Sequence, residues 1–75
     1  MAKKKNLKQA FDTQKEHGGT VLLAMILPYS EGDEVAEIIT VRHEYLDVKW
    51  DYIDKTYDDN LVMKNNPAVR IKYFG

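Results

Sequence analysis

The sequence predicts an α+β fold in which one N-terminal helix packs on a small antiparallel sheet of four or five strands. Three observations predict this fold. An apolar stripe at helical spacing near the N-terminus ends at two glycines, several later segments alternate apolar and polar residues, and short segments rich in turn-forming residues separate them. The 75 residues have room for one domain, which we expect to span residues 1–75.

The helix comes first in the chain. We expect residues 1–5 to form a disordered basic start, after which Asn6 is a suitable N-cap. Three apolar side chains then share one face at i, i+3 and i+4: Leu7, Ala10 and Phe11. Gly18 and Gly19 end the helix, because glycine adopts the left-handed conformation without steric cost. The predicted helix therefore covers residues 7–17.

The segment 20–27 (TVLLAMIL) predicts a strand that is apolar on both faces, because apolar side chains occupy odd and even positions alike. One short helix covers one face of a small sheet. The second face is therefore closed in one of two ways: the sheet curls into a partial barrel, or it meets another molecule. Several apolar side chains left in water would forfeit a few kcal/mol, comparable to the stability of a small domain. A homodimer is a natural solution.

The segment that follows is ambiguous. Pro28 ends the first strand, and residues 29–33 (YSEGD) have the composition of a turn. Residues 34–42 favour a second strand because they contain a β-branched run, but the apolar residues of 34–46 also fit a helix. The sequence leaves this choice between strand and helix open.

Three further segments complete the predicted sheet. Residues 45–53 alternate cleanly between apolar and charged side chains, which is typical of a strand with one wet face. Residues 54–60 (DKTYDDN) resemble a turn, and residues 61–63 can start another short strand. Residues 69–73 alternate again and predict a final strand near the C-terminus.

Composition excludes several classes of protein. The chain is 44% hydrophobic and 31% charged, which is typical of a folded protein. It contains no cysteine, which excludes disulfides and thiolate chemistry and favours a reducing cytoplasm. The longest apolar run, residues 21–27, is too short to span a membrane, which takes about 20 residues.

No motif for catalysis, a metal or a cofactor is present. His17 and His43 lie in different elements without metal-ligand spacing. The acidic segment 51–60 lacks the central glycine and closing glutamate of a calcium loop, and we interpret it as a solvated turn. Ser30 has no nucleophile elbow around it. We therefore expect a protein that is not an enzyme and uses no cofactor or metal.

Charge is distributed unevenly along the chain. Residues 1–17 and 60–75 are each basic by three charges, whereas residues 31–59 carry ten acids against three bases. The acidic middle, with its aromatic side chains, could bind a basic partner protein, or its charges could pair with the basic ends. Tyrosine and tryptophan dominate binding hot spots. The residues that we predict to bind a partner are Tyr45, Asp47, Trp50, Asp51, Asp54 and Tyr57.

These observations favour a non-catalytic interaction protein, a small dimeric binder or inhibitor of a partner protein. One alternative is a small molecule or nucleotide bound between two subunits. A further alternative, weak nucleic-acid binding, would use four N-terminal lysines: Lys3, Lys4, Lys5 and Lys8. The short length and the lysine-rich start are similar in style to those of short proteins encoded by phages and mobile elements, although no motif supports that origin.

Overall fold

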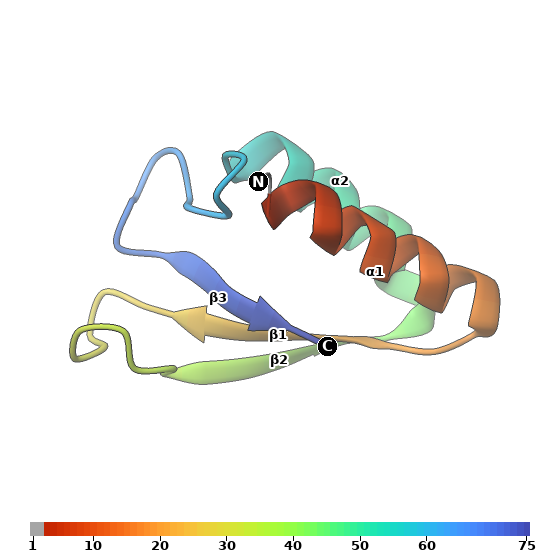
Figure 1. Ribbon diagram of the computed structural model, residues 1–75, viewed down its shortest axis with the longest axis horizontal. Helices are drawn as coiled ribbons and strands as arrows, with labels where there is room; N and C mark the ends of the chain where they lie inside the picture. The colour runs from red at the N-terminus through yellow and green to blue at the C-terminus, as the bar shows by residue number, and fades with distance from the viewer. Residues whose placement is uncertain (1–2) are drawn as a thin grey trace.

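The structure, a computed structural model, describes residues 3–75. Two helices lie on one side of a three-stranded antiparallel sheet, and within that range no element lies on the other side (Figure 1). The elements in chain order are α1 (Lys3–His17), β1 (Val21–Ile26), β2 (Glu37–Val41), the 3₁₀ turn η1 (His43–Tyr45), α2 (Leu46–Thr56) and β3 (Arg70–Phe74). The α+β prediction is confirmed, with a second helix that we did not expect.

The sheet has three strands in the order β2-β1-β3, so the predicted count of four or five strands is wrong. Strand β1 is central, with Ala24 opposite Ile38 of β2 and opposite Tyr73 of β3. The register between β1 and β3 shifts after Ala24, because Met25 pairs with Ile71 and leaves Lys72 as the extra residue of a bulge.

Helix α1 begins at Lys3, within the segment that we expected to be disordered; residues 1 and 2 lie outside the described part of the chain. Contacts with α2 and the segment after it account for the earlier start. The backbone N–H of Lys4 donates to the carbonyl of Asp59 at 3.1 Å. The Lys4 amino group donates to the carbonyls of Asp54 at 2.7 Å and Tyr57 at 2.8 Å. The helix ends as predicted, and Gly18 adopts φ +75°.

The predicted strand over residues 45–53 is wrong, because most of this segment lies in α2. The same residues that alternate along a strand also contain a helical pattern of buried or half-buried side chains, spaced by four, three and four: Leu46, Trp50, Ile53 and Tyr57. Val48 and Tyr52, which alternation grouped with Leu46, are exposed on the outer face of the helix. Burial against α1 and the sheet therefore selects the helical period.

Two other segments were predicted as strands, and the prediction is confirmed for one of them and wrong for the other. Residues 37–41 form β2, so the strand interpretation of the ambiguous region is confirmed for these residues, and a 3₁₀ turn and α2 follow. Residues 61–63 make only isolated bridges, Val62 to Arg70 and Met63 to Tyr57, and form no strand. Leu61 in this segment is buried although its φ is +61°, because its side chain reaches the core.

The hydrophobic core lies between the helices and the inner face of the sheet. From β1, the side chains of Val21, Leu23 and Met25 contribute to it. The helices add four buried side chains: Leu7, Phe11, Leu46 and Ile53. The alternate residues of β1 point to the opposite face of the sheet. We call this opposite face, formed by Leu22, Ala24, Ile26, Ile38, Thr40, Arg70 and Tyr73, the open face.

Candidate functional site: the open face and the surface of α2

The six residues predicted to bind a partner gather around α2, and not on a strand. Tyr45 ends η1, four lie within α2, and Tyr57 follows the helix directly. The structure therefore brings them onto one element, but it exposes them unequally. Their availability for a partner has to be judged residue by residue.

Tyr57 is buried in the core. Burial, with a smaller contribution from nearby Tyr52, raises the pKa of its phenol. The two rings lie edge to face with centroids 6.4 Å apart. A partner that approaches α2 from outside therefore meets Tyr52 and not Tyr57.

Trp50 is half-buried in the groove between the two helices. Its ring lies 5.5 Å from that of Phe11. The Lys8 amino group lies 5.6 Å from the Trp50 ring centroid, within cation–π range. Trp50 thus fixes α1 against α2, and only its outer edge remains for a partner.

The acidic side chains of α2 pair with lysines of the same chain. These ion pairs join Asp47 to Lys15 at 2.8 Å, Asp51 to Lys55 at 3.0 Å and Asp54 to Lys4 at 3.3 Å. The hydrogen bond to Asp47, reinforced by its charge, raises the pKa of Lys15. Two of the three pairs use lysines of α1, so the acidic middle and the basic start of the chain offset each other. This pairing weakens the case for a strongly basic partner.

The outer surface of α2 nevertheless presents an apolar ridge. Tyr45, Val48 and Tyr52 follow one another at i, i+3 and i+7, and all three are exposed. The amino group of Lys49 lies 5.1 Å from the Tyr52 ring centroid. Of the aromatic residues that we predicted to bind a partner, Tyr45 is exposed on this surface, whereas Trp50 is half-buried and Tyr57 is buried. Binding of a partner protein here stays a prediction.

The lysines that we considered for nucleic-acid binding are partly engaged within the protein. Lys4 contacts the carbonyls after α2, and its side chain is only 12% exposed. Lys8 pairs with Asp12 at 2.6 Å along α1. Lys3 and Lys5 lie in the first turn of α1, and both are exposed. Binding to phosphates would have to compete with the internal contacts of Lys4 and Lys8, which weakens that alternative.

The open face is an apolar surface that residue-by-residue reasoning missed as a site. Three side chains project from it into solvent with exposed fractions of 43% for Leu22, 61% for Ile38 and 55% for Tyr73. Between them Ala24 forms the floor, at 2% exposure. A hollow of about 220 Å³ results, lined by Leu22, Ala24, Ile38, Tyr73, Phe74 and Gly75. No charged side chain of residues 3–75 lines it.

The two-sided apolar pattern of residues 20–27 was the signal for this surface. It predicted that the helix would cover only one face of β1, and it left open whether the sheet would close over the other face or meet another molecule there. It did not predict that Ile38 and Tyr73 would flank Ala24, because that proximity depends on the strand register of a sheet whose outer strands follow long connections. The sequence pattern therefore identified the second apolar face of β1, whereas the strand register determined which side chains of β2 and β3 lie beside it.

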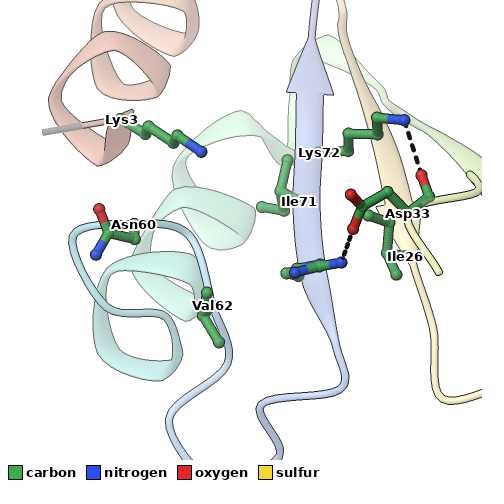
Figure 2. Close-up of a pocket in the computed structure, with 8 residues that line it drawn as sticks. Lys3, Ile26, Asp33, Asn60, Val62, Ile71 and Lys72 are labelled. Carbon is green, nitrogen blue, oxygen red and sulfur yellow. Dashed lines mark hydrogen bonds and ion pairs between the residues drawn. The ribbon is translucent and has the colours of Figure 1, made fainter. Parts of the chain in front are cut away.

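A second hollow, of about 250 Å³, lies around β3 and is lined by three basic side chains: Lys3, Arg70 and Lys72. Figure 2 shows that Lys3 and Lys72 lie on different sides of β3 and do not converge on one point. Arg70 forms an ion pair with Asp33, and the Lys72 amino group donates to the Asp33 carbonyl at 2.7 Å (Figure 2). Lys3 approaches from α1 on the other side of β3 (Figure 2). The contacts of Arg70 and Lys72 with Asp33 therefore link β3 to the 27–36 loop. Their geometry is that of a structural connection more than of an anion-binding site.

Histidines and carboxylates are dispersed. Within residues 3–75 no three histidine, aspartate or glutamate side chains lie close enough together to hold a metal ion. His43 lies beside the carbonyl of Gly19, with its Nδ1 atom 3.3 Å from that oxygen, and so joins the start of η1 to the loop after α1. No helix in the described part of the chain is long and apolar enough to cross a membrane.

Comparison of the chain with protein-family models, with curated proteins and with solved structures finds no match.

Proposed function

We propose that the protein is a non-catalytic interaction protein that self-associates, with a second copy of the chain covering the open face of the sheet. The observation that carries this proposal is the apolar hollow around Ala24, bordered by the exposed side chains of Leu22, Ile38 and Tyr73. An exposed apolar group of this kind, on a sheet with helices on one side only, is typical of an interaction surface.

The composition of the hollow favours binding over catalysis. Its lining consists of aliphatic and aromatic groups with one phenol, that of Tyr73. Catalysis by acid and base or by a nucleophile needs a carboxylate, imidazole, thiol or amine within hydrogen-bond reach of the substrate. Selective binding of a small polar molecule likewise needs several convergent polar groups. Apolar contact with a surface of similar chemistry is what this lining supports.

A second copy is the occupant that the open face fits best. A twofold axis would place the same face of two molecules together, so the exposed side chains of each copy would fill the hollow of the other. Among the described residues, no side chain that lines the hollow is charged. Arg70, at the margin, is already paired with Asp33. Two copies would then form four layers, with the helices outside and the two sheets packed face to face.

A stable contact would have to extend beyond the three exposed side chains of the open face. A stable dimer buries roughly 800 Å² per partner, which is about one sixth of the 4981 Å² surface of this chain. The three exposed side chains supply the apolar centre of that area, and the remaining open face with the flanking loops would supply its rim. The contact would therefore combine an apolar centre with a polar margin, as dimer interfaces usually do.

A matched pair of substitutions tests the proposal. Leu22→Lys puts a charge at the centre of the open face, whereas Val48→Lys puts the same charge on the outer face of α2. Both side chains are exposed, so both variants should fold, as circular dichroism can verify. Sedimentation equilibrium should give a smaller mass for Leu22→Lys than for Val48→Lys, because only the first substitution disrupts contact through the open face. Equal masses for both variants and the native protein would overturn the assignment to the open face.

A further inference from the structure

The two edge strands of the sheet, β3 and β2, differ in whether another segment pairs with their outer edge. The outer edge of β3 meets the segment 61–63, because the N–H of Ile71 donates to the carbonyl of Leu61 at 2.9 Å and Val62 bridges Arg70. Strand β2 pairs with β1 alone, and its other edge has no neighbouring strand in the part of the chain that is described. One edge is therefore covered and the other is free (Figure 1).

The register identifies the backbone groups that point outward from the free edge. Leu22 and Gly75 exchange two hydrogen bonds, at 2.9 and 3.1 Å, so the polar groups of Leu22 point toward β3. The backbone N–H and C=O groups of successive residues point to opposite sides along an antiparallel strand. The groups of Leu23 therefore point toward β2, where Ile39 is its partner. It follows that the N–H and C=O groups of Ile38 and Thr40 point outward from β2.

Apart from Glu37 at its first position, this edge lacks the usual protection against strand pairing. Natural edge strands are commonly blunted by a lysine, a proline, a bulge or a covering segment. From Ile38 to Val41 the strand is uncharged, contains no proline and consists of four β-branched residues, and its register with β1 is regular throughout. Such an edge is a template for another extended strand.

Charge indicates which strand fits. Glu34 and Glu37 lie at the N-terminal end of this segment, whereas at its C-terminal end Arg42 forms an ion pair with Glu44 at 2.8 Å. An antiparallel copy of the same segment would place the acidic end of each chain beside the charge-balanced end of the other, with Glu37 close to Arg42. A parallel copy would place Glu37 beside Glu37. Charge therefore favours the antiparallel direction over the parallel one.

We propose that β2 pairs with β2 of a second copy in an antiparallel ladder centred on Ile39. In this register Ile38 lies opposite Thr40 of the second copy, and the four outward-pointing groups of each strand find partners across the axis. The two sheets join into one sheet of six strands, and the two open faces lie side by side. The inference rests on the proposed self-association but uses a different surface, because edge pairing leaves the open face uncovered. Stacking and edge pairing together give two kinds of twofold contact, which can close as a tetramer.

The absence of cysteine makes the pairing testable with single thiols. At the centre of the ladder, residue 39 of each copy forms a non-hydrogen-bonded pair with Cα atoms about 4.5 Å apart, which suits a disulfide. Ile39→Cys should give a disulfide-linked dimer under mild oxidation. Val48→Cys on α2 is the control and should remain uncrosslinked. Tyr73→Cys reports on the open face.

Amide hydrogen exchange of the native chain gives a second readout that requires no substitution. The N–H groups of Ile38 and Thr40 point away from the sheet of their own chain, so they should exchange fast in dilute protein. At high concentration they should slow by about tenfold or more, as expected for hydrogen-bonded groups. Crosslinking of Ile39→Cys together with this slowing supports the edge ladder.

The outcomes separate the two proposals. An associated native protein in which Tyr73→Cys crosslinks, Ile39→Cys does not, and the two amides stay fast would overturn the edge ladder and leave the stacked arrangement. A native chain that remains monomeric, with no crosslink at either position, would overturn both proposals. If the two amides slowed only in the presence of an added extended peptide, the edge would serve a foreign strand, and pairing with a second copy would be wrong.

Discussion

Ala24 and Tyr73 lie opposite each other on β1 and β3, yet the first is 2% exposed and the second 55% exposed. The small side chain is shielded by its larger neighbours, which themselves remain in water. This contrast defines the open face: a closed floor within a border of exposed apolar groups. The covered face of the same strand contains Leu23, which is fully buried beneath the helices.

The two faces of β1 should respond differently to truncation. Leu23→Ala removes a buried side chain and should lower the free energy of unfolding by about 2 to 5 kcal/mol. Leu22→Ala, on the open face, should cost about 1 kcal/mol or less in dilute protein, because its side chain is already partly hydrated. Urea denaturation of both variants measures the difference. Equal losses would show that the open face is covered within one chain.

Lys4 should stabilise the fold although it lies in the first turn of a helix, where a cation is unfavourable. Its amino group binds two carbonyls near the end of α2, those of Asp54 and Tyr57. Lys4→Met keeps the aliphatic stem but leaves these carbonyls without their donor, so the free energy of unfolding should fall by about 1 to 2 kcal/mol. Lys5→Met, at an exposed position, is the control. A loss no larger than that of the control would refute the role of Lys4.

Stability should fall at alkaline pH because of Tyr57. Burial raises the pKa of this phenol in the folded state above its ordinary value of 10.0. The unfolded chain therefore loses this proton first. The stabilisation that results from this difference in the pKa of Tyr57 is complete below about pH 10. It disappears as the pH rises through the pKa of the folded state.

Tyr57→Phe tests this dependence because it keeps the buried ring and removes the proton. Thermal melts between about pH 8 and pH 11, a window chosen around the ordinary tyrosine pKa of about 10, should show a shallower alkaline loss for Tyr57→Phe than for the native chain. Tyr29→Phe, at an exposed position, should leave the alkaline loss unchanged. If Tyr29→Phe flattened the profile as much, the burial of Tyr57 would not be its cause.

Gly18 should resist substitution. Its φ of +75° ends α1, and a side chain at this angle is strained even though the space beside its Cα is open, with no other atom within 4 Å of where a Cβ would lie. Gly18→Ala should cost about 1 kcal/mol through the backbone alone. Thermal denaturation provides the measurement. An unchanged melting temperature would mean that the chain ends α1 in another conformation without cost.

The sequence allowed the prediction of α1, β1 and β3 because each has one dominant signal, and for β2 it favoured a strand without excluding a helix. The glycines after His17 end α1, and the β-branched run of residues 38–41 has a strong strand preference. The strand prediction for residues 45–53 was wrong because the apolar residues of this segment fit both the period of a strand and the period of a helix. Leu46 and Trp50 fit both, and only the later positions Ile53 and Tyr57 continue the helical one. A window extended to residue 57 would have favoured the helix.

The candidate site was predictable only in outline. The apolar character of both faces of β1 allowed either closure of the sheet into a partial barrel or a face that meets another molecule, and the structure leaves Leu22, Ile38 and Tyr73 of the second face exposed. The partner-binding residues were chosen for their charge and for the frequency of tyrosine and tryptophan at binding hot spots, and the alternation of the predicted strand separately placed Trp50 and Tyr52 on one face. In the helix Trp50 turns toward Phe11, and Tyr52 lies on the exposed side. The internal pairing of Asp47 and Asp54 with lysines of α1 depends on how the two helices pack, which local patterns do not specify.

The molar mass of the native chain in solution tests the central claim most directly. Sedimentation equilibrium over a dilution series at neutral pH should give a mass of at least twice the 8.7 kDa of one chain, falling toward the monomer on dilution. A constant mass of one chain at every concentration would contradict self-association through the sheet.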